Sequence, residues 1–122
     1  MHEYGLTKQI VKVVNDAALE HGASGVETVY LVVGENTSII PQSVQMYYDQ
    51  IAKGTLSQGA KISTRVIKSQ MHCPKCEKNF FRPRFSFACP DCGTLGHMTD
   101  IGNEFYVESV EMDFLDNETE EA

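Results

Sequence analysis

The chain has 122 residues, four cysteines and a net charge of −7, and 42% of its residues are hydrophobic. This length accommodates one ordinary domain, or one small core with an appended lobe, and it excludes a large multidomain enzyme. The composition is globular, with no apolar run long enough for a membrane span and no signal peptide at the start, so we expect a cytoplasmic protein without membrane contact.

The first predicted element is an amphipathic helix that begins near Leu6. Its apolar residues recur at helical spacing as far as Ala17. The pattern ends at His21, a cationic side chain that suits the last turn of a helix, and at Gly22, which suits the position after it. The helix is therefore expected to bury one apolar face against a sheet.

A strand and a second helix are predicted next. Residues 26–33 are rich in β-branched side chains and predict a largely buried strand. Residues 34–40 form a loop, and Pro41 then suits the first turn of a helix. Gly54 is expected to close that helix.

Two more strands are predicted on either side of the cysteines, over residues 60–69 and 105–114, because apolar and polar residues alternate in both. We therefore expect an α/β (α+β) fold in which a small three-stranded sheet with two helices carries an inserted zinc-ribbon lobe. Residues 1–70 with 100–122 form the expected α/β domain, and residues 71–99 form the lobe.

The cysteines form two C-x2-C pairs separated by twelve residues, at Cys73, Cys76, Cys89 and Cys92. In a reducing compartment such pairs indicate a metal site and not disulfides. Two pairs complete the tetrahedron of thiolates that Zn(II) prefers, and a closed site of this kind is structural. A dithiol redox site and a rubredoxin-type iron site use the same residues and remain alternatives.

His72 and His97 flank the two pairs. We favour surface positions for both histidines and keep alternate zinc ligation open, since exchange of a cysteine for a histidine would make the lobe respond to pH. Phenylalanines between the pairs alternate with two arginines, a composition also found in zinc ribbons that bind single strands. We expect these phenylalanines to pack the small lobe and its junction: Phe80, Phe81, Phe85 and Phe87.

The amino terminus provides a second candidate metal site. The amine of Met1, the amides of His2 and Glu3, and the His2 Nδ1 atom lie close along the chain and could form a plane of four nitrogens. Such a plane suits Ni(II) or Cu(II). The Glu3 carboxylate could bind axially or orient the imidazole, or it could complement the dipole of the helix that follows.

Taken together, Met1-His2-Glu3 and the inserted cysteine pairs resemble the HypA/HybF family of hydrogenase nickel-incorporation proteins. Several short motifs occur in the order that the family uses: Gly34-Glu35, Pro41-Gln42-Ser43, Lys53-Gly54-Thr55, Gly59-Ala60 and Gly102-Asn103-Glu104. Residues 36–38 depart from the pattern of many members. The resemblance covers nearly the whole chain.

The resemblance implies a metallochaperone that binds one Ni(II) and one structural Zn(II). It implies nickel binding by His2 with the Met1 amine and Glu3, and zinc binding by the four cysteines. The implied partners are a maturation GTPase, the large-subunit precursor of [NiFe]-hydrogenase and, where urease is the recipient, a urease accessory protein. Residues 1–70 with 100–122 then become the nickel-binding domain of a monomer or weak homodimer.

A different reading is a zinc-ribbon adaptor that binds nucleic acid or protein through its phenylalanines and arginines, without a second metal. Nucleic acid is not expected as a partner, because residues 100–122 carry nine acidic side chains and no basic one. An enzyme is not expected either, since we find no nucleophile with a base, no phosphate-binding glycine loop and no open metal site.

Overall fold

The computed structural model describes residues 2–115, and of His2 it describes the backbone alone. These residues form two compact units, of which the second contains Val32–Ser38 and Arg65–Phe105 and the first contains the rest. The predicted lobe, residues 71–99, lies within the second unit. Among residues 2–115, no helix combines the length and the apolar character that a membrane span requires.

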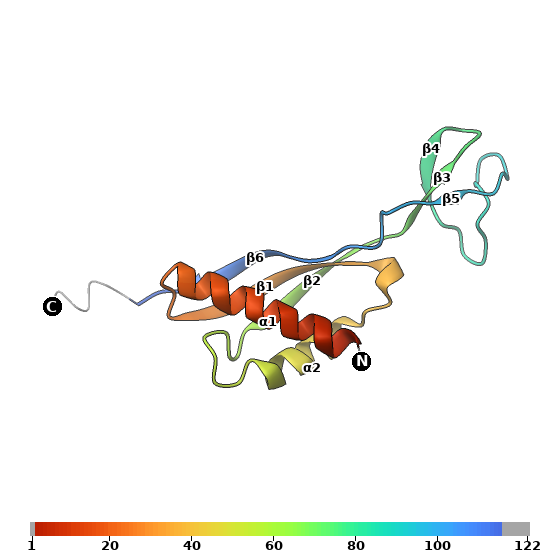
Figure 1. Cartoon of the computed structure of the whole chain (residues 1–122). Helices are drawn as coiled ribbons and strands as arrows, with labels where there is room; N and C mark the ends of the chain where they lie inside the picture. Colours follow the sequence, from red (N-terminus) through yellow and green to blue (C-terminus); the bar gives the residue numbers. More distant parts are fainter. Residues whose placement is uncertain (1, 116–122) are drawn as a thin grey trace. The chain divides into compact units, whose positions relative to one another are not determined.

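The main sheet has three strands in the order β2-β1-β6. The strands are β1 (Gly25–Gly34), β2 (Lys61–Ile67) and β6 (Phe105–Asp113), and two helices, α1 (His2–Glu20) and α2 (Pro41–Ile51), lie on the same side of the sheet (Figure 1). A 3-10 turn, η1 (Glu35–Thr37), follows β1. The predicted fold class is therefore confirmed.

The helix α1 begins at His2, four residues before the predicted start. Its first turn is held by the hydroxyl of Thr7, which donates to the carbonyl oxygen of Glu3 at 2.6 Å. At its other end Gly22 has a φ of 71° and Ala23 donates its N–H to Ala18, as predicted for a glycine that ends a helix. The buried face consists of Thr7, Ile10, Val11, Val14 and Ala18.

The helix α2 begins with Pro41, as predicted, and packs beside α1. The rings of Tyr47 and Tyr4 meet edge to face, with centroids 5.4 Å apart. Tyr48 is fully buried, and its hydroxyl has no hydrogen-bond partner among the residues described. Burial raises the pKa of Tyr48, because a phenolate would lose its hydration there, and the nearby Ser57 side chain offsets only part of this rise.

Tyr48→Phe is expected to leave stability at neutral pH unchanged or higher by up to about 1 kcal/mol, because it removes a buried hydroxyl without a partner. The raised pKa means that the unfolded chain loses the phenol proton first. Wild-type stability should therefore fall as pH rises above about 10, and the variant should lose less. Urea unfolding from pH 9 to 11 checks this, and parallel curves for the two proteins would contradict it.

A second sheet, which sequence periodicity did not predict, forms the centre of the lobe. Its order is β4-β3-β5, and its strands are β3 (Gln70–Cys73), β4 (Lys78–Phe81) and β5 (His97–Met98). Both pairings are antiparallel. The ends of the lobe meet, since Gln70 donates its N–H to Ile101 at 3.3 Å and the Thr99 hydroxyl donates to the Gln70 carbonyl oxygen at 2.7 Å.

Two of the family motifs come together beside these lobe ends. Gly34 donates its N–H to the carbonyl oxygen of Glu104 at 2.6 Å, and Asn36 donates its N–H to Gly102 at 2.7 Å. A Cβ atom on Gly34 would lie 2.1 Å from the carbonyl oxygen of Gly102. The backbones approach so closely here that only glycine fits at position 34.

Side chains complete this junction. The Glu35 carboxylate accepts the N–H of buried Ser69 at 2.8 Å, and the Asn36 amide donates to the Asn103 side-chain oxygen at 3.1 Å. Asn36 belongs to the short stretch that departs from the family pattern. It therefore joins the two motifs through a side-chain pair.

Candidate metal centre

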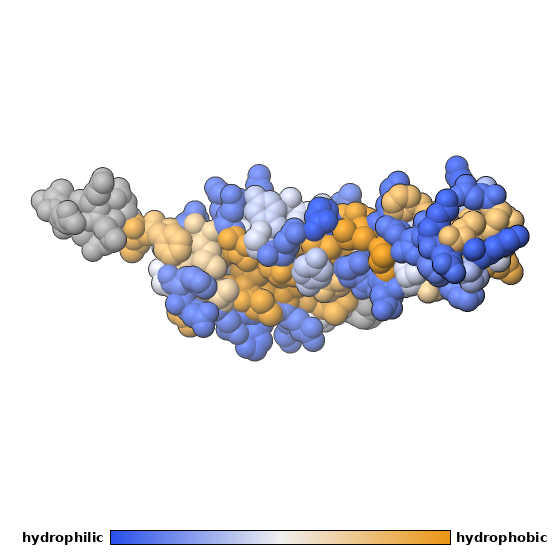
Figure 2. Space-filling model, turned by 90° about the horizontal axis from the view of Figure 1, so that it is seen from above, coloured by the Kyte–Doolittle hydropathy of each residue, from blue (hydrophilic) through white to orange (hydrophobic). Residues whose placement is uncertain are grey.

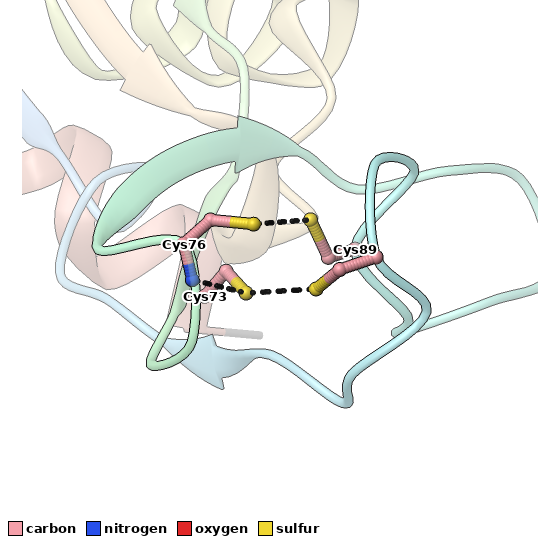
Figure 3. A group of neighbouring side chains, drawn as sticks. Cys73, Cys76 and Cys89 are labelled. Atoms are coloured by element: carbon pink, nitrogen blue, oxygen red, sulfur yellow. Dashed lines mark hydrogen bonds between the residues drawn. The ribbon is translucent and has the colours of Figure 1, made fainter.

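The four cysteines converge on one point in the lobe (Figure 3). The Sγ atoms of Cys73 and Cys92 are 3.5 Å apart, those of Cys76 and Cys89 are 4.0 Å apart, and all four lie within 4.8 Å of one another. Four sulfurs around one zinc, each at about 2.3 Å, are about 3.8 Å apart in a regular tetrahedron. The cluster thus has the size and donor set of a four-thiolate zinc site.

Each C-x2-C pair is shaped by the same backbone turn. The N–H of Glu77 donates to the carbonyl oxygen of Cys73 at 2.8 Å, and the N–H of Gly93 donates to that of Cys89 at the same distance. The residue after each pair has a left-handed backbone, with φ of 58° at Glu77 and 77° at Gly93. The two turns therefore present their sulfurs alike, although only the second has a glycine at this position.

The lobe has a small apolar core of its own next to the sulfurs. Met71, Cys73, Phe80 and Cys89 are buried there, and the other two cysteines pack against them half-buried. Gly96 lets the ring of Phe80 lie close, since a Cβ at that position would be 2.6 Å from the ring. With so little apolar area to bury, the lobe would gain folding free energy from a metal ion bound by the four cysteines.

Two of the thiols differ markedly in acidity when no metal is bound. Hydrogen bonding with Thr94 lowers the pKa of Cys92 to about 6, whereas hydrogen bonding with the Cys92 sulfur raises the pKa of Cys76 to about 12. A divalent cation is needed before all four sulfurs can be thiolates together.

The histidines that flank the cysteine pairs lie outside the sulfur cluster. His72 is in β3 and His97 is in β5, and among the described residues the cluster contains cysteines alone. The Nδ1 atom of His72 is hydrogen-bonded to the side-chain oxygen of Asn79 at 2.9 Å. Alternate zinc ligation by either histidine therefore remains a prediction.

The expectation that the phenylalanines pack the lobe is correct for Phe80 and wrong for the other three. Phe81 is 61% exposed, Phe85 is 91% exposed and Phe87 is 50% exposed. The Arg82 and Arg84 guanidinium groups lie over the rings of Phe87 and Phe85, 5.1 and 5.3 Å from the centroids. The lobe is too small to enclose these rings, and Figure 2 shows apolar and hydrophilic residues intermixed over its surface, at the right of the view.

The amino-terminal site is only partly described. Met1 and the side chain of His2 lie outside the described residues, and the backbone of His2 is the first residue of α1. Glu3 lies in the first helical turn, and its carboxylate accepts the N–H of Ile40 at 3.3 Å. Sequence patterns gave no sign of this contact, because it joins residues 37 positions apart.

Comparison with known families finds a match that covers most of the chain. A family model described as hydrogenase/urease nickel incorporation, metallochaperone, HypA matches residues 1–112. A hydrogenase maturation factor HypA of Caldanaerobacter subterraneus subsp. tengcongensis is 35% identical over 93% of this chain and 100% of its own length. One of Dehalococcoides mccartyi is 30% identical over 93% of this chain and 95% of its own.

Two solved structures share the fold. A solution structure of HypA protein superposes with a TM-score of 0.69 at 21% identity, over 92% of this chain and 96% of that one. The solution structure of the Ni metallochaperone HypA from Helicobacter pylori gives a TM-score of 0.61 at 19% identity, over 93% of this chain and 98% of that one. At these identities the two superpositions establish the fold.

Proposed function

Since the chain belongs to the HypA family of hydrogenase/urease nickel-incorporation metallochaperones, we propose that it binds one Ni(II) at its amino terminus and delivers it during maturation of [NiFe]-hydrogenase. The ligands in this proposal are the Met1 amine, the backbone amides of His2 and Glu3, and the imidazole of His2. The nickel ion is cargo, whereas the four-cysteine site of the lobe holds one structural Zn(II).

The observation that carries this proposal is the start of α1 at His2. The first N–H groups of a helix have no intrahelical acceptor, so the amides of His2 and Glu3 can bind a metal without loss of a helix hydrogen bond. Their deprotonation would make the nickel complex formally neutral. A neutral complex avoids the repulsion between a cation and the positive end of the helix dipole.

The Glu3 side chain supports a role for its backbone amide. Its carboxylate is engaged by the N–H of Ile40, and its carbonyl oxygen accepts the hydroxyl of Thr7. These two contacts fix the first helical turn and thereby the direction of the amides that precede it. We therefore assign Glu3 to nickel through its backbone, with the carboxylate as an anchor.

Adding the two residues Gly-Pro before Met1 tests this site. The extension keeps His2, Glu3 and α1 but converts the primary amine of Met1 into an amide, and proline has no amide proton to lose, so the new amine cannot form a chelate with His2. The extended chain should therefore lose high-affinity nickel. Zinc content and thermal unfolding should stay unchanged. Calorimetry with nickel measures the loss, and His2→Ala should produce the same loss.

The matched control for this experiment is His21→Ala, which removes an exposed histidine at the other end of α1 and should leave nickel binding intact. If the extended chain bound nickel as tightly as the native one, the amine would not be a ligand.

The family names also guide our proposal for partners. We assign the chain to the cytoplasm, as a monomer or weak homodimer without catalytic activity. Its partners in this proposal are a maturation GTPase and the hydrogenase large-subunit precursor, or a urease accessory protein where urease receives the nickel.

The second candidate function, a zinc-ribbon adaptor without a second metal, is favoured by the exposure of Phe81, Phe85 and Phe87. An adaptor would bind no nickel at its amino terminus. The extension experiment therefore separates the two functions directly.

A further inference from the structure

His72 and His97 lie directly opposite each other on neighbouring strands of the lobe sheet. In an antiparallel pair, opposite residues project from the same face, and their Cβ atoms are about 4.5 to 5.5 Å apart. His97 is exposed and His72 is half-buried, so both are accessible from solvent. The register therefore brings two imidazoles within reach of a single ion.

This pair is separate from the zinc site. Side chains alternate between the two faces of a strand, so His72 projects from the face opposite to its neighbours Met71 and Cys73. Those neighbours belong to the buried core beside the sulfurs. The thiolates and the two imidazoles thus lie on opposite faces of β3.

A hydrogen bond with Asn79 orients the imidazole of His72 and leaves one of its nitrogens available to bind a metal. Asn79 is the register partner of His72 on β4, and its side-chain oxygen lies 2.9 Å from Nδ1. The Asn79 amide nitrogen donates to the side-chain oxygen of Gln70 at 3.3 Å, which orients the amide oxygen toward His72. An amide oxygen accepts only, so the proton is on Nδ1 and the lone pair of Nε2 is free for a metal.

We propose that His72 and His97 form a second, exposed binding site for a divalent transition metal, and that it receives Ni(II). Imidazole nitrogens suit nickel, copper and zinc, and the choice of nickel rests on the proposed function, whereas the site itself does not. Two protein ligands leave the remaining coordination positions to water. The ion is therefore exchangeable, as a transient holding site requires.

The test uses the full chain without a histidine tag, loaded with zinc and carrying the Gly-Pro extension before Met1 that removes the amino-terminal chelate. Titration with nickel chloride in a calorimeter should show one weaker site per chain. Adding His72→Ala or His97→Ala should lower its affinity at least tenfold, whereas His21→Ala should not change it. Zinc content is measured on the same samples. If His72→Ala disturbs the adjacent Cys73 and lowers the zinc content, the nickel affinity of His97→Ala still tests the site.

The proposal is overturned if the extended chain binds no nickel, or if its nickel survives both histidine substitutions. Failure of the amino-terminal proposal would look different. In that case the native and extended chains would bind nickel alike, and His97→Ala would still remove one site from each.

Asn79→Ala tests the positioning role of Asn79. Loss of the partner of a metal-binding histidine typically costs 10- to 100-fold in metal affinity, so a loss of that size is expected with zinc retained. Copper(II) provides a spectroscopic readout, since its electron paramagnetic resonance should show two nitrogen ligands in the extended chain and one in the extended His97→Ala chain. If the two chains gave the same copper spectrum, His97 would not be a ligand and the proposed pair would be wrong.

Discussion

Cys76→Ser is expected to release the zinc and unfold the lobe while the first unit stays folded. Structural zinc sites of this type contribute about 10 to 16 kcal/mol in small domains, far more than the apolar core beside the sulfurs could replace. The helices α1 and α2 keep a buried face of their own. Metal analysis should therefore give no zinc, and helical circular dichroism should persist.

A suitable control for this variant is Lys75→Ser, which changes an exposed residue between the same two cysteines and should retain zinc. X-ray absorption of the wild type should show sulfur ligands alone, at about 2.3 Å. A spectrum that required nitrogen would bring His72 or His97 back as a zinc ligand. Loss of the helical signal in Cys76→Ser would contradict the independence of the first unit.

Gly34→Ala is expected to destabilise the protein by about 3 kcal/mol or more, at the upper end for single substitutions. The new Cβ would lie 2.1 Å from the Gly102 oxygen and 2.6 Å from the Asn103 nitrogen. These are backbone atoms that cannot rotate away, so the strands must separate and lose the bond from Gly34 to Glu104. Urea unfolding of the zinc-loaded protein measures the loss.

Gly5→Ala, in contrast to Gly34→Ala, is expected to stabilise the protein. Gly5 lies in α1 with open space around its Cβ position, and alanine is favoured over glycine in a helix by about 0.5 to 1 kcal/mol. A similar destabilisation by both substitutions would show that the close approach at Gly34 is not the cause.

The elements with enough residues to show a period were predictable. Pro41 placed the start of α2 correctly, and alternation located β2. The start of α1 was predicted too late because residues 2–5 include a glycine and show no apolar period. Contacts of Glu3 with Thr7 and Ile40 hold that turn in place.

Within the lobe, the sequence predicted the four sulfur ligands but not the strands that surround them. Cysteine spacing alone indicated the four sulfur ligands, since the geometry of a C-x2-C turn is local. The strands β3, β4 and β5 have four, four and two residues, too few for a readable alternation. The opposition of His72 and His97 depends on the register of those strands, which only the structure provides.

The hydrogen bonds of Gln70 with Thr99 and Ile101 determine how well the protein should tolerate changes in the length of the lobe. Because hydrogen bonds hold the two ends of the lobe together, the intervening segment behaves energetically as a loop that is already closed. The free-energy cost of closing a loop, which is entropic, grows only with the logarithm of the loop length, by about 0.6 kcal/mol for each doubling. Insertions between the cysteine pairs should therefore be tolerated, and the lobe can change in size while the sheet and the helices keep their sequence.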